Sequence, residues 1–214
     1  MDNNNTDAGS KLVIATLYEL KPRFQQLLRP LTAWFARRGV TANQLTVAAA
    51  LGSVALGIAL VAAQSSRVFL LLPLFLFLRM ALNAIDGMLA REHGQASKIG
   101  AILNELGDVV SDSALYLPFA LLPGASAWLV VVVVLLAALS EMAGVLGLTI
   151  GASRRYDGPM GKSDRALIFG LLALLVGVNV PLAAYLNWVF GLVAVLLILT
   201  CIRRARRALA EVGA

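Results

Sequence analysis

The amino-acid sequence predicts an all-α polytopic membrane protein in which six transmembrane helices follow an interfacial amphipathic helix. Three observations predict this fold class. Of the 214 residues, 59% are hydrophobic and only 14% are charged, whereas a soluble domain carries about a quarter charged residues. The apolar residues form six runs near the length of about 20 residues that a helix needs to cross a bilayer. The Lys and Arg residues gather at alternate ends of these runs, as in proteins whose cytoplasmic loops are basic.

The first elements are expected to be a disordered polar segment over residues 1–11 and an amphipathic helix within residues 12–39. The polar segment lacks the apolar stretch of a signal peptide. In the amphipathic region, arginines are interleaved with apolar side chains at helical spacing. These apolar residues are Leu20, Phe24, Leu27, Leu28, Leu31, Trp34 and Phe35. Because a predicted span follows directly, we expect this helix to lie in the cytoplasmic interface; packing on a soluble partner is the alternative.

The six predicted spans form one domain over residues 40–203, followed by a cytoplasmic tail over 204–214. They occupy residues 43–63, 67–90, 98–122, 125–150, 163–180 and 183–203. A turn around Asn179 and Pro181 makes the last two a tight hairpin. Basic residues precede the first span, follow the second, fourth and sixth, and leave only Arg67 on the opposite side.

This charge pattern predicts that both termini lie in the cytoplasm. The net charge of +6 is then explained by topology and by contacts with anionic membrane lipids. No nucleic-acid partner is expected, because the basic residues lie between apolar runs and not on the face of a soluble fold.

Ionisable side chains within the spans are the candidates for function, because an unpaired charge in a bilayer costs at least about 2.5–3.5 kcal/mol. They are Arg79, Asp86, Glu105, Asp108, Asp112 and Glu141. Spacings of three, four and seven residues place one group on a single face at the end of the second span. This group is Asn83, Asp86, Gly87, Ala90 and Arg91. Gly100, Asn104 and Asp108 share a face of the third span, so the two faces are expected to form a pocket open to the cytosol.

The segment Asp86-Gly87-Met88-Leu89-Ala90-Arg91, followed after eight residues by Gly100, resembles the signature of the CDP-alcohol phosphatidyltransferase family. That signature has four aspartates: one three residues before the Asp-Gly pair, one in it, and two at four-residue intervals after the later glycine. The six-span layout and residues 40–46 at the start of the first span also resemble the family. The resemblance implies an enzyme of phospholipid biosynthesis that moves a phosphatidyl group from a CDP-linked lipid to an alcohol acceptor and releases CMP. The two asparagines at signature positions, Asn83 and Asn104, are similar to those of a bacterial branch of the family, which implies a bacterial inner membrane as the location and CDP-diacylglycerol as the donor.

Carried over to this sequence, the resemblance implies that Asp108 is the base that deprotonates the acceptor alcohol. It also implies that Asp86, Asn83, Asn104 and Asp108 hold divalent metal, either Mg²⁺ or Mn²⁺. Because Asn83 and Asn104 stand where the signature has aspartates, two ligand charges are missing and the choice between one and two ions stays open.

Two further acids could compensate for the missing charges. Glu105 lies beside Asn104 and could supply a carboxylate to the metal, and Asp112, one turn deeper, is a possible accessory residue. An alternative register makes Asp108 and Asp112 the last two acids of the signature, but it displaces the match at Gly100.

Other residues are candidates for substrate binding. Gly87, Ala90 and Gly100 leave room for close approach by the cytidine or a backbone, and Arg91 can bind a phosphate with two hydrogen bonds. Lys162 and Arg165 could hold an acceptor or lipid phosphate, with a purely topological role as the alternative.

Arg79 and Glu141 are expected to be structural ion-pair partners. A catalytically silent binding or scaffold protein is one rival function. A cation-coupled transporter is another, although the acids cluster at one end of two adjacent spans. A homodimer is possible.

Overall fold

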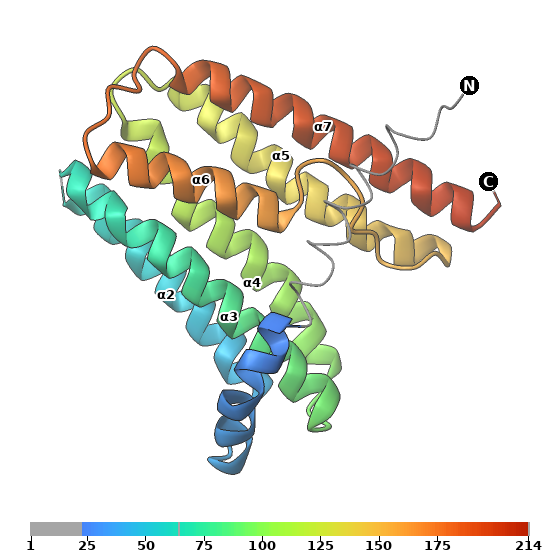
Figure 1. Ribbon diagram of the computed structural model, residues 1–214. Coiled ribbons are helices and arrows are strands. Elements are labelled where there is room, and N and C mark those ends of the chain that lie inside the picture. The colour runs from blue at the N-terminus through green and yellow to red at the C-terminus, as the bar shows by residue number, and fades with distance from the viewer. Residues whose placement is uncertain (1–22, 64, 214) are drawn as a thin grey trace, which may run out of the picture.

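The computed structural model describes residues 23–63 and 65–213, and every regular element within these ranges is a helix (Figure 1). A helix over residues 23–37 comes first. The longer helices are α2 (Ala42–Ala62), α3 (Leu71–Glu92), α4 (Lys98–Tyr116), α5 (Ala127–Leu146), α6 (Lys162–Gly177) and α7 (Leu186–Glu211). Three short 3₁₀ helices adjoin them: η1 (Ser66–Leu70), η2 (Leu117–Leu121) and η3 (Gly147–Ile150).

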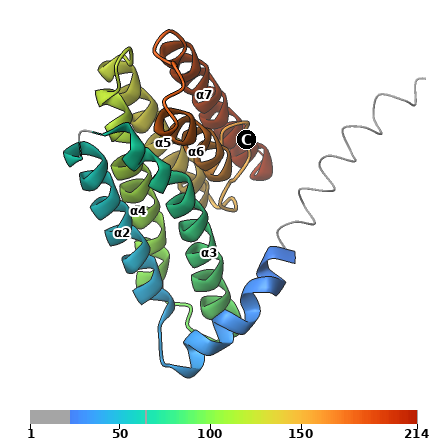
Figure 2. The same cartoon turned by 60° about the vertical axis from the view of Figure 1, so that its left-hand side comes forward.

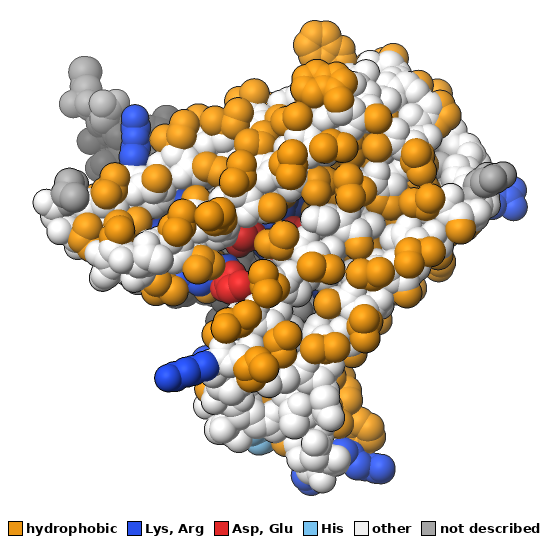
Figure 3. Space-filling model, turned by 180° about the vertical axis from the view of Figure 1, so that it is seen from behind, with side chains coloured by type: hydrophobic (Ala, Val, Ile, Leu, Met, Phe, Trp, Pro, Cys, Tyr) orange, Lys and Arg blue, Asp and Glu red, His pale blue; other side chains and the backbone are white. Residues whose placement is uncertain are grey.

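The prediction of a polytopic membrane protein is confirmed. Four helical stretches among the described residues are long and apolar enough to cross a membrane: Ala42–Ala62, Ser66–Glu92, Ala127–Ile150 and Leu186–Glu211. Helix α4 is not among them, since it carries four charged residues, and α6 has only 16 residues. The surface agrees with this class: Figure 3 shows hydrophobic side chains over most of one face, with acidic side chains inside a hollow.

The helices form two groups that meet along the middle of the molecule. Helix α2 packs against both α3 and α4, and α5 packs against α7. Contacts of α6 with α3, and of α4 with α5, join the groups (Figures 1 and 2). Each group therefore contributes helices to the region between them.

The helix over residues 23–37 packs across the ends of α2 and α3 that lie nearest to the loop between α3 and α4 (Figure 2). Leu28, Phe35 and Ala36 contact an apolar cluster of α2 and α3 that includes Leu45 and Met88. The ring of Phe24 lies 5.9 Å from that of Phe77. The segment predicted as disordered, and residues 12–22 of the predicted amphipathic helix, lie outside the described residues.

The beginning of α2 is fixed by hydrogen bonds that residues 40–46 make locally. Thr41 Oγ1 accepts a hydrogen bond from Gln44 N at 3.2 Å, while Thr41 N donates to Gln44 Oε1 at 2.9 Å. This reciprocal cap satisfies backbone groups that a helix end leaves without partners. Ala42 N donates to Gln95 Oε1 at 2.7 Å. The start of α2 is thereby tied to the loop between α3 and α4.

Aromatic side chains fill the core at the opposite end of the bundle. Tyr116 stacks on Phe169 with ring centroids 3.9 Å apart, and Phe119 packs edge-on against the same ring at 5.1 Å. Phe190 of α7 completes the cluster. All four side chains are fully buried, so α4, α6 and α7 are held together here by apolar contacts, with Tyr116 at the border to the buried charges of Asp112 and Arg165.

Helix α7 continues to Glu211 and so includes most of the segment predicted as a cytoplasmic tail. The reason is packing beyond the apolar run. Arg204 is 2% exposed and Ala208 is 3% exposed, and Arg155 Nη1 forms an ion pair with Glu211 at 2.6 Å. These contacts hold the end of α7 against the loop that follows η3.

Helices α2 and α4 approach closely at Gly57, and this contact makes a prediction for stability. A Cβ added at Gly57 would meet the backbone carbonyl of Ala114, so the helices must separate to accept it. We expect Gly57→Ala to lower the free energy of unfolding by about 1–3 kcal/mol, measured by thermal unfolding in detergent. Gly191→Ala is the matched control, because a Cβ there has nothing within 4 Å. Equal effects of the two substitutions would contradict the prediction.

Candidate active site

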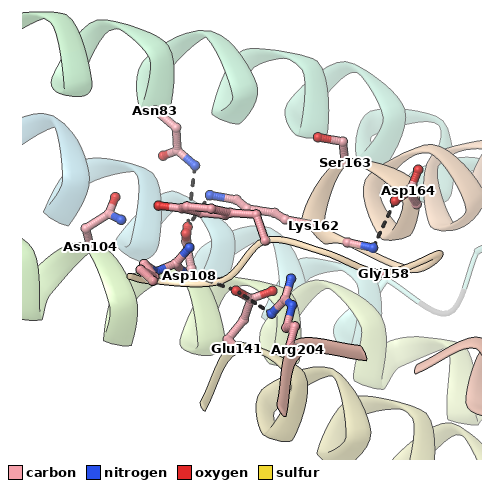
Figure 4. Close-up of a pocket in the computed structure, with 12 residues that line it drawn as sticks. Asn83, Asn104, Asp108, Glu141, Gly158, Lys162, Ser163, Asp164 and Arg204 are labelled. Carbon is pink, nitrogen blue, oxygen red and sulfur yellow. Dashed lines mark hydrogen bonds and ion pairs between the residues drawn. The ribbon is translucent and has the colours of Figure 1, made fainter. Parts of the chain in front are cut away.

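Asp108 is the centre of the charged region between the two helix groups. Its Oδ1 atom contacts Arg79 Nη2 at 3.1 Å, Asn83 Nδ2 at 3.4 Å and Lys162 Nζ at 2.5 Å. Figure 4 shows Asn83 and Lys162 reaching this carboxylate. Among the described residues, none donates a hydrogen bond to Asp108 Oδ2. One carboxylate oxygen is therefore held in place, and the other is available to a ligand.

Asp86 lies next to this group, at the wall formed by α2 and α3. Thr46 Oγ1 donates a hydrogen bond to Asp86 Oδ2 at 2.8 Å, and the side chain is only 7% exposed. Lys162 and Asp108 are near enough for their charges to act on Asp86, but Asp86 is not among the residues that line the pocket beside Asp108. The cap at Thr41 sets the beginning of α2 and, one turn later, the position of Thr46.

A pocket of about 430 Å³ opens beside Asp108. Its walls come from α3, α4, α5, the loop before α6, α6 itself and α7. The lining residues are Asn83, Asn104, Asp108, Glu141, Arg154, Tyr156, Gly158, Gly161, Lys162, Ser163, Asp164 and Arg204. Because almost every side chain in this set is polar or charged, the pocket suits a polar and ionised ligand.

The loop over residues 151–161 forms one side of the pocket and is held by α7. Met160 N donates a hydrogen bond to Thr200 Oγ1 at 3.0 Å. Gly158 has a φ of +130° and packs so tightly on Thr200 that an added Cβ would lie 2.5 Å from Thr200 Cγ2. Both the backbone conformation and the space require glycine here. The loop thus delivers Gly161 and Lys162 to a fixed place at the start of α6.

One turn along α4 from Asp108, buried ion pairs connect four helices: α3, α4, α5 and α6. Arg79 bridges Asp108 and Asp112, with 2.6 Å to Asp112 Oδ1. Arg165 contacts Asp112 at 2.8 Å and Glu141 at 2.9 Å. All but Asp108 are less than 10% exposed, so each charge depends on its partner for stabilisation. Arg79 and Glu141 thus have the ion-pair partners that their burial requires.

Arg154 links this network to the rim of the pocket. Its guanidinium contacts Glu105 at 2.6 Å and Glu141 at 3.3 Å, and it stacks over the ring of Tyr156 at 4.2 Å. Burial disfavours its charge, but the hydrogen bond and the charge of Glu105 raise the pKa of Arg154 above its ordinary value. Glu105 is engaged by this arginine and does not line the pocket.

The structure places the other sequence-predicted site residues outside the pocket lining. Arg165 is 1% exposed and is enclosed by its ion pairs. Gly87 lies against Arg91, whose Nη2 would be 3.1 Å from an added Cβ, and Gly100 faces Asn43 of α2. Ala90 lies between Gly87 and Arg91 on α3. Of the predicted substrate contacts, Lys162 alone lines the pocket within the described part of the chain.

Several lining residues were not singled out from the sequence as site residues. Arg154 and Arg204 belong to the basic groups after the fourth and sixth spans that topology explains, and the sequence does not distinguish Tyr156, Ser163 or Asp164 as site residues. The sequence does carry a signal for some of them: three glycines and a basic pair lie within residues 151–161, which is unusual for a plain connection. Arg204 gave no such signal, because it lies in a run of arginines and is distinguished only by its burial.

The site offers oxygen ligands of the kind that bind hard divalent cations. Carboxylates and amide carbonyls are the ligands that Mg²⁺ and Mn²⁺ favour, and Asp86, Asp108, Asn83 and Asn104 offer them on adjacent helices. Within residues 23–63 and 65–213, no three or more His, Cys, Asp or Glu side chains cluster as metal ligands.

Sequence comparisons with known proteins identify a family and two relatives. The sequence model for CDP-alcohol phosphatidyltransferase matches residues 39–202. Inner membrane protein YnbA of Escherichia coli (strain K12) is 50% identical over 194 residues, covering 91% of this chain and 96% of YnbA. Archaetidylinositol phosphate synthase of Pyrococcus horikoshii is 28% identical over 187 residues, covering 81% of this chain and 91% of the synthase.

Solved structures share the fold. The Mycobacterium tuberculosis phosphatidylinositol phosphate synthase with CDP-DAG bound superposes with a TM-score of 0.73 at 20% identity, covering 88% of this chain and 96% of that one. The same enzyme in complex with manganese and citrate gives a TM-score of 0.71 at 20% identity, covering 86% and 90%. With the family match over three quarters of its length, the chain belongs to the CDP-alcohol phosphatidyltransferase family of membrane enzymes.

Proposed function

We propose that this protein transfers a phosphatidyl group from CDP-diacylglycerol to an alcohol with release of CMP, at the cytoplasmic face of a bacterial inner membrane. The name of the Escherichia coli relative supports the location. The CDP-DAG bound by the structural neighbour supports the donor. The archaeal relative, named as a synthase of an inositol phosphate lipid, supports a polyol or its phosphate as the acceptor class.

One observation carries this proposal: a polar pocket and an apolar groove meet at Ser163. The groove, of about 470 Å³, runs between α3 and α6. Its lining is Pro73, Leu76, Phe77, Met80, Ser163, Ala166, Leu167, Gly170, Leu171 and Leu174. A ligand that fills both spaces must join an ionised head to a hydrocarbon chain, which is the chemistry of a CDP-linked lipid.

In the proposed reaction, the acceptor hydroxyl attacks the phosphorus that carries the diacylglycerol. The new bond joins the acceptor oxygen to this phosphorus, the bond to the CMP phosphate breaks, and the hydroxyl proton passes to Asp108. A carboxylate suits this role because it has a free oxygen within the pocket and is oriented by Arg79 and Asn83. Gly87, Ala90, Arg91 and Gly100 remain the proposed contacts of the cytidine end.

Asp86, Asp108, Asn83 and Asn104 are proposed to hold divalent metal. When bound, the ion would neutralise the diphosphate and stabilise charge on the departing CMP. Lys162 adds a positive charge beside Asp108 and is placed to contact a phosphate oxygen. Arg165 stabilises the site indirectly, through its ion pair with Asp112.

The topology that fits this reaction has six spans and cytoplasmic termini. In it α4 and α6 also cross the membrane, with the acidic side chains of α4 turned into the bundle, where ion pairs neutralise them. The helix over residues 23–37 lies in the cytoplasmic interface, with Arg29 paired to Glu92 at 3.3 Å. The polar pocket then opens where a water-soluble acceptor and a lipid donor can both reach it.

The proposal is tested by incubating purified protein in nanodiscs with CDP-diacylglycerol, Mn²⁺ or Mg²⁺, and alcohols with and without a phosphate group. We expect CMP release that needs both the metal and one class of alcohol. CDP-diacylglycerol binding without CMP release in any of these mixtures would instead establish a catalytically silent binding protein.

A bulky side chain in the apolar groove tests the site of the acyl chain. Ala166 lines the groove on α6, and we expect Ala166→Phe to raise KM for long-chain CDP-diacylglycerol about tenfold, which corresponds to a modest loss of apolar contact. The KM for a short-chain donor should change much less. Leu192→Phe, on an exposed position of α7, is the matched control. Equal KM changes for both chain lengths would place the acyl chain elsewhere.

A further inference from the structure

We propose that Lys162 is a built-in cation of the active site, and that the chain consequently binds one divalent ion where the four-aspartate signature of its family provides ligands for two. This inference rests on the proposed function and specifies its metal requirement. The residues involved are Asn83 and Asn104, which stand at signature positions, and Lys162, which lines the same pocket.

The position of Lys162 is fixed by the fold. It is the first residue of α6, and Gly161 N donates a hydrogen bond to Asp164 Oδ2 at 2.8 Å. The hydrogen bond from Met160 to Thr200 holds the preceding loop. From this place Nζ reaches Asp108 Oδ1, while the side chain is 33% exposed. The ammonium group is therefore directed to the acid by its backbone and can still meet a ligand in the pocket.

Helix stability does not explain a lysine at this position. The first turn of a helix carries partial positive charge, which disfavours a cation. Asp164 satisfies the backbone there, and the charge of Lys162 is balanced by Asp108 of a different helix. Lys162 therefore interacts with Asp108 of the site, and it is not needed for α6 to begin at this residue.

Asn83 is matched to this arrangement. Its Nδ2 donates to the same Asp108 oxygen that Lys162 contacts. An aspartate at position 83 would place a second carboxylate against Asp108, and the two would repel each other unless a cation lay between them. With asparagine, Asp108 Oδ1 is stabilised by an amide and an ammonium group, so a second ion is not needed to offset a carboxylate at position 83.

The charges point to one ion as well. Four carboxylates balance two divalent cations. Here Asp112 is matched by Arg79 and Arg165, so only Asp86 and Asp108 remain as acids at signature positions. Lys162 offsets part of their charge, which leaves enough negative charge for one divalent ion and too little for two. A second ion would be repelled by both the first ion and Lys162. The donor itself brings roughly one negative charge per phosphate, which the single ion and Lys162 can neutralise together.

Counting Mn²⁺ bound to the purified full-length protein by electron paramagnetic resonance tests the inference without measuring turnover. We expect one ion per chain in the wild type. Lys162→Gln should still bind one ion, with a Kd about tenfold lower because a like charge has been removed from its neighbourhood. Lys98→Gln removes the same charge from an exposed position at the start of α4 and should leave the Kd unchanged.

Restoring the signature supplies the converse test. The triple variant Asn83→Asp, Asn104→Asp, Lys162→Gln should bind two Mn²⁺ ions, and Lys162→Met serves if the glutamine variant unfolds. Two ions in the wild type, an unchanged or higher Kd without Lys162, or a single ion in the triple variant would each overturn the inference. CMP release assayed in parallel separates the two proposals: release with two ions refutes only the role of Lys162, and a single ion without release refutes only the transferase reaction.

Discussion

Asp108→Asn is expected to lower the rate of CMP release by about 10²–10⁴-fold, the range for loss of a positioned general base. An amide cannot accept the proton of the acceptor hydroxyl, and the substitution also removes one of the two carboxylates available to a metal ion. The pocket itself should persist, because the amide oxygen at this position could still accept hydrogen bonds from Arg79 and Lys162. The measurement is the initial rate of CMP release at saturating donor and acceptor.

The control for Asp108 is a carboxylate-to-amide change outside the pocket. Glu92→Gln breaks only the ion pair with Arg29, in which both side chains are well exposed, and should leave the rate close to that of the wild type. If Asp108→Asn retained more than a tenth of wild-type activity, another group would have to be the base.

Asp112→Asn is expected to lower the free energy of unfolding by about 3–5 kcal/mol, the cost of removing one partner from a buried ion pair. Asp112 is 4% exposed and binds two guanidinium groups, those of Arg79 and Arg165. Its loss leaves more positive than negative charge between α3, α4 and α6. The effect is measured as the decrease in thermal unfolding temperature in detergent.

A surface ion pair provides the comparison for this stability effect. Breaking the contact between Arg29 and Glu92 should cost less than about 1 kcal/mol. If Asp112→Asn unfolded at the wild-type temperature, the buried network would not be what holds the two helix groups together. An activity loss at unchanged stability would make Asp112 part of the chemistry, as the alternative register of the signature implies.

Much of the fold could be predicted from periodicity and length. The six apolar runs coincide with helices α2 to α7, and the expected turn at Asn179 is present as a left-handed residue with a φ of +61°. The continuation of α7 past residue 203 could not be predicted, because it depends on burial of Arg204 and Ala208 against distant segments. Hydropathy also says little about α4, whose charges are paired only in three dimensions.

The candidate site could be predicted only where local spacing fixes it. Four-residue intervals place Asn104 and Asp108 on one face of α4 whatever surrounds them, and both line the pocket. The partner of a charge is a tertiary property. Glu105 turns to Arg154 and Arg165 turns to Asp112 because loops and helices far apart in sequence meet there.

The central claim is that Asp86 and Asp108 together hold a divalent cation that binds the donor diphosphate. Pulsed electron–nuclear double resonance on Mn²⁺-loaded protein with CDP-diacylglycerol tests it most directly. We predict strong ³¹P coupling from the bound donor in the wild type, and loss of this signal in both Asp86→Asn and Asp108→Asn. Bound Mn²⁺ without ³¹P coupling, or coupling that survives in the two variants, would contradict the account.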